Sequence, residues 1–125
     1  MTENEIAKVI VDLSFKIHSE LGPGLFESVY EEILFYELVE EGLDVKRQIE
    51  IPVYWQELKM DVGFRADLIV ENKVIIEIKS IESLAPVHFK QVITYLKITK
   101  FKLGLLINFN ENLLKDGIKR VANNL

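Results

Sequence analysis

The sequence predicts a single α/β domain in which two N-terminal helices and a later third helix pack on a central mixed β-sheet. Apolar residues recur every three to four positions at the start of the chain and again after residue 86, which is typical of amphipathic helices. Between these segments lie short runs of β-branched and aromatic residues separated by turn residues, which indicate strands. The apolar run at 102–110 is continuous, as in a strand buried on both faces.

Two helices are expected before residue 43. Thr2 and Glu5 form a capping-box pattern that opens the first helix, which runs to about Leu21. Gly22 then suits a helix end and Pro23 prevents continuation. The second helix is expected to start near Leu25 or Phe26 and to end at Gly42, with these residues buried: Phe26, Val29, Tyr30, Ile33, Leu34 and Leu38.

The later segments predict four strands and one helix. Residues 45–55 form a strand with Pro52 at an edge or bulge, and residues 58–64 return as a second strand after a turn. Residues 65–70 and 74–80 form the clearest hairpin in the chain. A helix at 86–98 buries Val87, Val92, Tyr95 and Leu96, and a short helix is expected near the C-terminus. The order is α-α-β-β-β-β-α-β, and the helical crossover makes strands 74–80 and 102–110 parallel.

Composition limits the function classes. A chain of 125 residues is expected to form one domain, residues 1–125. It has no cysteine, which excludes disulfides, thiolate zinc sites and cysteine nucleophiles. No apolar run approaches the ~20 residues of a membrane span, and the acidic N-terminus is unlike a signal peptide, so a cytoplasmic protein without membrane contact is expected.

Charge is divided unevenly between the two parts of the chain. The net charge of −5 argues against a general nucleic-acid coat. Residues 1–44 carry two basic and eleven acidic residues, a net of −9, whereas residues 45–125 carry thirteen basic and nine acidic residues, a net of +4. The second part therefore suits contact with a polyanion.

The hairpin contains the main candidate site. If its turn is centred on Asn72, Asp67 lies opposite Glu77 and Arg65 opposite Lys79, all on one face. The other face, from Phe64 and Ala66 through Leu68 and Val70 to the isoleucines of 74–78, is apolar. Carboxylates opposed at ~5 Å between β-carbons cost stability unless something compensates them. Mg²⁺ or Mn²⁺, bound by both carboxylates and by a backbone carbonyl such as that of Ile78, is the simplest compensation.

An acid two residues before a lysine is a weak motif by itself. It occurs four times here, and only Glu77 with Lys79 is embedded in an apolar strand opposite another acid. The alternative interpretation is a solvent-facing cluster of Arg65, Asp67, Glu77 and Lys79 with no binding role. A shift of one residue in the hairpin register would also remove the pairing.

Two separated segments resemble a known family. "HSELGPGLFESVY" is similar to the signature of the GxxExxY family, with Gly24, Glu27 and Tyr30 at the named positions. "RADLIVENKVIIEIKS" followed by "LAPVHFKQVITYL" resembles the core of the PD-(D/E)XK nuclease superfamily, to which that family is assigned. The resemblance extends over about residues 5–110 and implies a restriction-endonuclease-like fold.

The resemblance also implies residue roles. Asp67 and Glu77 match the metal ligands and Lys79 the catalytic lysine, although Ala66 replaces the superfamily's proline. Glu27 matches an acid on the N-terminal helix beside the same site, which makes it a third carboxylate for the metal. Further candidates are on the helix that follows the lysine strand and on the hairpin, for catalysis or contact with phosphate: Gln91, Tyr95, Lys97, Lys100 and Arg65.

Several of these residues have a structural alternative. Glu27 also fits the first turn of a helix, where the macrodipole favours an acid whatever its function. The lysines, together with Lys90 and Lys102, also fit a solvated helix face, and Tyr30 fits the core with its hydroxyl bonded at the edge. His18 is expected to pack or cap, because it and His88 lack the spacing of a zinc site.

The expected function is a Mg²⁺- or Mn²⁺-dependent nuclease that hydrolyses phosphodiester bonds in nucleic acid, DNA in preference to RNA. The alternative is a non-catalytic nucleic-acid-binding or oligomeric interaction module on the same scaffold. A homodimer is compatible with either.

Overall fold

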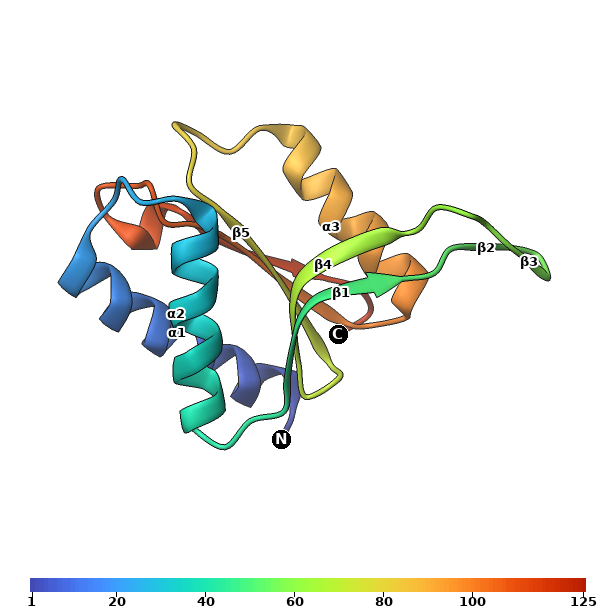
Figure 1. Cartoon of the computed structure of the whole chain (residues 1–125), viewed down its shortest axis with the longest axis horizontal. Helices are drawn as coiled ribbons and strands as arrows, with labels where there is room; N and C mark the ends of the chain where they lie inside the picture. Colours follow the sequence, from blue (N-terminus) through green and yellow to red (C-terminus); the bar gives the residue numbers. More distant parts are fainter.

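A five-stranded mixed sheet forms the centre of the protein, which we describe from a computed structural model covering residues 1–125. The sheet order is β1-β4-β5-β6-β7, and only β5 and β6 are parallel. This is the mixed α/β architecture that the sequence predicts (Figure 1). In chain order the elements are α1 (Glu3–Leu21), α2 (Glu27–Glu40), β1 (Val45–Ile51), β2 (Tyr54–Trp55), β3 (Leu58–Lys59), β4 (Phe64–Val70), β5 (Val74–Lys79), α3 (Pro86–Thr99), β6 (Leu103–Asn108), the 3₁₀ helix η1 (Leu114–Asp116) and β7 (Ile118–Ala122).

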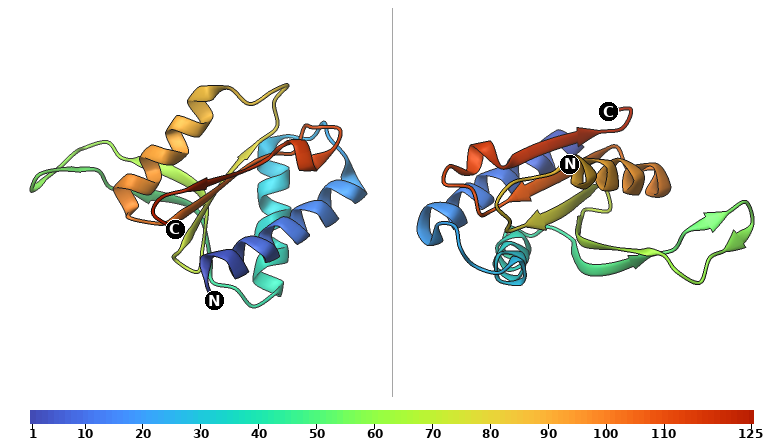
Figure 2. Two further views of the ribbon diagram at one scale, coloured as in Figure 1. Left: turned by 180° about the vertical axis from the view of Figure 1, so that it is seen from behind. Right: turned by 90° about the horizontal axis from the view of Figure 1, so that it is seen from above.

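Helices cover both faces of the sheet. On one face, α1 and α2 pack on a large apolar cluster that includes Ile10, Leu34 and Ile76. On the other face, α3 packs on a smaller cluster that includes Val92, Leu96 and Leu106 (Figure 2). Every residue of β6 is buried, as the continuous apolar run predicts. The capping box of α1 is also confirmed: the Glu5 amide donates to Thr2 Oγ1 at 3.2 Å, and the Thr2 amide donates to Glu5 Oε1 at 2.9 Å.

Gly104 sets how closely α3 approaches the sheet. A β-carbon at this position would lie 2.5 Å from Val92 Cγ1 of α3. A side chain on Gly104 would therefore push the helix outward, together with the residues that α3 carries over the sheet. The absence of a side chain at Gly104 lets α3 sit directly on β6.

The chain between β1 and β4 does not form two long strands. Residues 52–63, which we call the arm, contain only the short antiparallel pair β2–β3 and project from the body (Figures 1 and 2). The predicted strands at 45–55 and 58–64 are wrong in extent, because Pro52 interrupts the first strand and only Leu58–Lys59 of the second pairs within the arm.

Two other expectations are corrected. The short helix expected in the C-terminal segment is only the three-residue 3₁₀ helix η1, and the chain then forms strand β7, because pairing with β6 completes the sheet edge. Phe26 and Val87 were expected to be buried but are 82% and 53% exposed. Both lie at helix starts: Phe26 is the extended residue just before α2, and Val87 is in the first turn of α3.

The apolar side chains of β1 and β4 change faces part-way along. Leu68 and Val70 pack under α1 and α2, whereas Phe64 and Ala66 pack toward α3. The prediction of one apolar face from Phe64 to Val70 is therefore wrong. The change occurs where the β1–β4 pairing is interrupted, at Gln48, whose φ is +51°, and at Asp67.

No helix in the structure has both the length and the apolar character needed to span a bilayer.

Candidate active site

The candidate site lies where β4 and β5 diverge. Their ladder has the predicted register but covers only Leu68↔Ile76 to Val70↔Val74. Beyond it, β4 continues with β1 toward the arm while β5 continues with β6 (Figure 1). The expected ladder pairs Asp67 with Glu77 and Arg65 with Lys79 do not form, because the Asp67 carboxylate takes the place of a backbone partner. Its Oδ2 accepts a hydrogen bond from the Ile78 amide at 2.8 Å.

Asp67 and Glu77 nevertheless form a carboxylate pair, in which Glu77 is buried and Asp67 is partly exposed. Glu77 is only 7% exposed, although it is charged in its usual state. Burial, followed by the negative charge of Asp67 beside it, raises the pKa of the Glu77 carboxyl to about 9. Two neighbouring carboxylates, one of them nearly buried, therefore share this site without a protein cation fully compensating them.

Lys79 and Tyr95 border the carboxylate pair. Burial and Asp67 raise the pKa of the Glu77 carboxyl, whereas the ammonium group of Lys79 lowers it. The positive charge of Lys79 therefore lies near that carboxyl. On α3, the half-buried Tyr95 stacks on Phe64 with ring centroids 3.9 Å apart. Partial burial, and then the charges of Glu77 and Asp67, raise the pKa of the Tyr95 phenol. The phenol therefore lies within electrostatic reach of the two carboxylates.

A series of hydrogen-bonded side chains that the sequence did not predict links Asp67 to α2. Gln48 Nε2 donates to Asp67 Oδ1 at 3.2 Å and to Glu31 Oε1 at 2.6 Å. Glu31 is only 5% exposed. Its carboxylate also accepts a hydrogen bond from Arg47 Nε at 2.7 Å. The only sequence signal for Glu31 as a site residue was its position one helical turn after Glu27. Nothing in the local pattern marks Gln48.

Glu27 lies beside the end of β5 but does not join the carboxylate pair. Its Oε2 accepts from the Ser80 amide at 3.2 Å, one residue after Lys79. No three acidic or histidine side chains in the chain lie together as a ligand set. The expectation of a three-carboxylate cluster with Asp67 and Glu77 is therefore wrong, because Glu27 holds the backbone at Ser80 instead.

The loop between α1 and α2 is fixed against the same end of β5. Ser80 Oγ donates to the Leu25 carbonyl at 2.6 Å. Tyr30 is fully buried, and its hydroxyl donates to the Gly22 carbonyl at 2.5 Å and accepts from the Leu25 amide at 3.2 Å. Gly24 has φ +106°, a conformation that glycine adopts readily. The core role expected for Tyr30 is confirmed, and the clamp that it forms positions Glu27.

Asn108 fixes the segment after Lys79 and was also missed. It is fully buried at the end of β6, level with Lys79 in the parallel ladder. Its Nδ2 donates to the Ile81 carbonyl at 3.0 Å, and its Oδ1 accepts from the Ile81 amide at 3.1 Å. This two-point contact restricts how the chain leaves the lysine strand.

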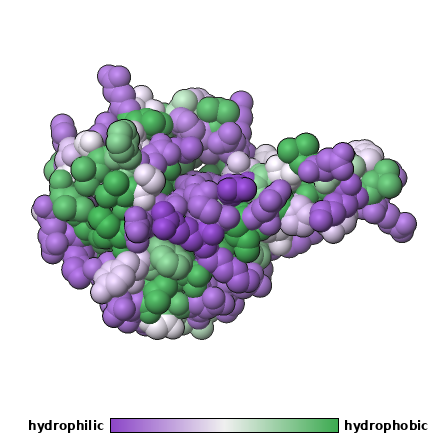
Figure 3. All heavy atoms as spheres, in the orientation of Figure 1, coloured by the Kyte–Doolittle hydropathy of each residue, from purple (hydrophilic) through white to green (hydrophobic).

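The remaining candidates are solvent-accessible. On α3, Gln91 and Lys97 are exposed, as is Lys100 at its C-cap, and Arg65 is exposed on β4 opposite Glu50. None of the three basic side chains, Arg65, Lys97 and Lys100, forms an ion pair. Figure 3 shows hydrophilic residues gathered across the middle of one face, over the sheet between α2 and the arm.

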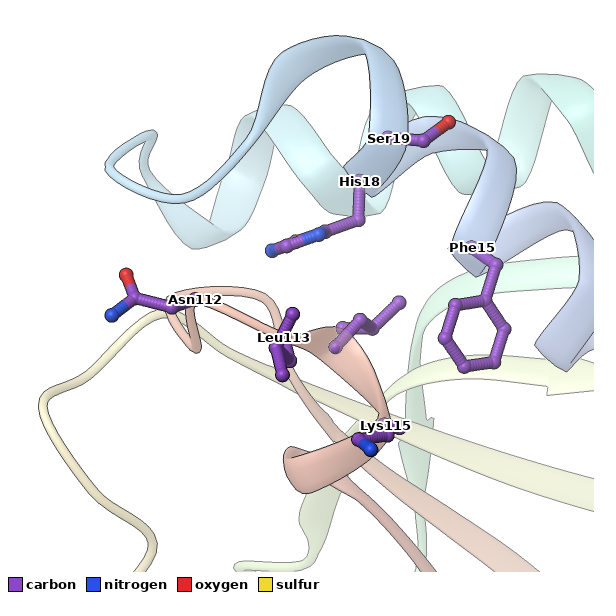
Figure 4. Close-up of a pocket in the computed structure, with 7 residues that line it drawn as sticks. Phe15, His18, Ser19, Asn112, Leu113 and Lys115 are labelled. Atoms are coloured by element: carbon purple, nitrogen blue, oxygen red, sulfur yellow. The ribbon is translucent and has the colours of Figure 1, made fainter.

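His18 lies in a different place. Its Nε2 is 2.7 Å from the Glu111 carbonyl, and the ring is buried, so the expected packing role is confirmed. It lines a pocket of about 310 Å³ between α1 and residues 112–115, which include the start of η1 (Figure 4). None of the residues of the carboxylate site lines this pocket: its lining residues are Phe15, His18, Ser19, Asn112, Leu113, Leu114 and Lys115.

Comparison with protein-family models agrees with this geometry. A model described as the PD-(D/E)XK nuclease superfamily matches residues 4–121. The chain therefore belongs to the PD-(D/E)XK nuclease superfamily, and its five-stranded mixed sheet with three helices is consistent with the restriction-endonuclease-like fold. No curated protein and no solved structure matches the chain significantly. Members of the superfamily generally hydrolyse phosphodiester bonds and typically use divalent metal ions. Membership in this nuclease superfamily implies a nucleic-acid substrate.

Proposed function

We propose that this protein is a Mg²⁺- or Mn²⁺-dependent nuclease of the GxxExxY type, with DNA as its substrate. The observation that supports this most strongly is the pair formed by Asp67 and the buried Glu77, with Lys79 two residues further along the strand. A purely structural charge cluster would be expected to face solvent with its charges paired. Glu77 is instead buried next to a second carboxylate, which suits a cation supplied from solution.

The donor set fits a hard divalent cation. Asp67 and Glu77 would each provide a carboxylate oxygen, which Mg²⁺ and Mn²⁺ favour. The Ile78 amide points toward Asp67. Because the N–H and C=O of one strand residue point to the same side, the Ile78 carbonyl is directed into the same gap between β4 and β5. Water would complete the coordination, as is usual for Mg²⁺.

The bound ion would act as a Lewis acid toward the phosphodiester and lower the pKa of a coordinated water. Lys79 would place its ammonium group against the phosphate or the attacking water and offset the negative charge that develops during attack. Glu27 would act through water from its position at Ser80, and Gln91 would orient water or phosphate from α3. The Tyr95 hydroxyl would donate to a phosphate oxygen, since the raised pKa keeps the phenol protonated.

Substrate contact is proposed along α3 and the exposed part of β4. Lys97 and Lys100 would contact phosphates on one side of the carboxylate pair and Arg65 on the other, because exposed basic residues provide most non-specific affinity for nucleic acid. The acidic segment 1–44, with its net charge of −9, would repel the polyanion and direct it toward these residues.

A cleavage assay with purified protein tests the proposal. Labelled single- and double-stranded DNA and RNA are incubated with Mg²⁺, with Mn²⁺ and with EDTA. We expect metal-dependent cleavage that falls at least 10²-fold in Asp67→Asn, Glu77→Gln and Lys79→Met, with unchanged circular dichroism. Glu82→Gln, an exposed acid in the loop after β5, is the matched control and should retain activity.

Two results would contradict parts of the proposal. Cleavage by all three variants at the wild-type rate would refute the assignment of the site. Metal-independent binding with no cleavage of any of the four substrates would favour the alternative of a non-catalytic nucleic-acid-binding module.

A further inference from the structure

We propose that the arm, residues 52–63, is a dimerisation surface at which β3 pairs edge to edge with β3 of a second copy of this chain. This inference is independent of the proposed nuclease activity. The arm leaves the body after β1 and returns at β4, and no helix or strand of the body packs on it in either view (Figures 1 and 2).

The arm exposes large apolar side chains. Trp55 is 69% exposed, Tyr54 57%, Leu58 66% and Val62 78%. A two-stranded hairpin is marginally stable in water and needs further strands or a packed face. Together with Met60, these side chains form an apolar surface that the arm does not cover by itself.

The charge of the arm disfavours nucleic acid as its partner. Its only charged residues are Glu57, Lys59 and Asp61, which give a net charge of −1. Binding to phosphates depends on clusters of lysine and arginine, and the arm has a single cation. An apolar surface with balanced charges fits a protein partner better.

The edge of β3 is complementary to itself. The small sheet contains only β2 and β3, so β3 has one unpaired edge. In an antiparallel pair of two β3 strands centred on Leu58, Glu57, the turn residue just before β3, would lie opposite Lys59 of the other copy. A two-fold axis through Leu58 therefore gives two opposite-charge pairs from one three-residue sequence.

The apolar side chains also become continuous in this arrangement. Trp55 and Leu58 are cross-strand partners and so share one face of the hairpin. Pairing through β3 would place the two Leu58 side chains side by side, with a Trp55 flanking each of them. The resulting four-stranded sheet has one apolar row across its face and pairs the two β3 edges that are free in the monomer.

Sedimentation velocity from about 1 to 200 μM tests the proposal. The expected mass at high concentration is twice the 14.5 kDa of the chain. Leu58→Asp, which opposes two like charges at the two-fold axis, should give a monomer throughout this range. Tyr36→Ser removes a side chain that is 60% exposed on α2 and should leave the dimer unchanged.

Charge exchange separates specific pairing from general adhesion. Either single exchange, Glu57→Lys or Lys59→Glu, places like charges opposite each other at both pairs of the dimer. It should weaken the dimer about tenfold. Combining Glu57→Lys with Lys59→Glu restores both opposite-charge pairs and should restore the wild-type dissociation constant. A wild-type protein that is monomeric at all concentrations overturns the proposal, as does a dimer that the double exchange fails to restore. A monomer whose DNA affinity falls in Trp55→Ser would also overturn it, since the arm would then contact nucleic acid.

Discussion

Replacing Glu77 by glutamine should stabilise the metal-free protein, and the effect should grow with pH. The pKa of the Glu77 carboxyl rises from 4.5 to about 9 in the folded state, first because it is buried and second because Asp67 lies beside it. Below pH 4.5 the carboxyl is protonated whether the chain is folded or unfolded, so its raised pKa costs no stability. Above pH 4.5 the unfolded chain loses this proton while the folded protein keeps it, and folding becomes less favourable until the pH passes about 9.

The size of the effect follows from the slope of 1.36 kcal/mol per pH unit for one proton. At pH 7 the cost of Glu77 in the wild type is roughly 3 kcal/mol, and at pH 5 it is below about 1 kcal/mol. Glutamine copies the protonated side chain in size and polarity but does not titrate. Glu77→Gln should therefore match the wild type near pH 5 and exceed it by a few kcal/mol near pH 8.

Urea unfolding in EDTA at pH 5, 6, 7 and 8, followed by circular dichroism, measures this difference. Subtracting the two proteins cancels the titrating groups that do not interact with Glu77. Glu82→Gln controls for the loss of one exposed carboxylate. A difference in the free energy of unfolding that stays constant from pH 5 to pH 8 would refute the burial argument for Glu77.

Three further changes test the surroundings of the site. Tyr30→Phe should lower the free energy of unfolding by roughly 2 kcal/mol, measured by urea titration, because the Gly22 carbonyl and Leu25 amide lose their partner; an unchanged midpoint would contradict the clamp. Gly24→Ala should cost roughly 1–2 kcal/mol in the same assay, since its φ of +106° disfavours any side chain although space is free around it. Gln48→Ala should raise the dissociation constant for Mn²⁺ about tenfold with little change in secondary structure, because Asp67 loses its link to Glu31; equal Mn²⁺ affinity in calorimetry would show that the link does not position Asp67.

Local sequence signals predicted most of the fold. Helix caps such as Thr2 with Glu5, the period of the apolar residues and the 71–73 turn each determine structure within a few residues. The C-terminal strand β7 was missed because its pairing with β6 depends on a free sheet edge, which no local pattern reveals. The arm was misread for the opposite reason: its sequence favours strands, but no neighbouring strand is available to extend them beyond two residues.

The candidate site shows the same limit. Asp67, Glu77 and Lys79 belong to one hairpin, so alternation along the strands was enough to bring them together. Gln48 and Asn108 belong to separate strands, and their roles depend on where β1 and β6 meet the ends of β4 and β5. The position of Glu27 depends on the path of the α1–α2 loop, which directs its carboxylate to Ser80 rather than to Asp67.

The central claim is that Asp67 and Glu77 bind one divalent metal ion. Isothermal titration calorimetry with Mn²⁺, on the metal-free protein at pH 7.5, tests it most directly. We expect one Mn²⁺ per chain in the wild type and in Glu82→Gln, and no measurable binding in Asp67→Asn or Glu77→Gln. Absence of binding to the wild type at millimolar Mn²⁺, or equal binding in all four proteins, would contradict it.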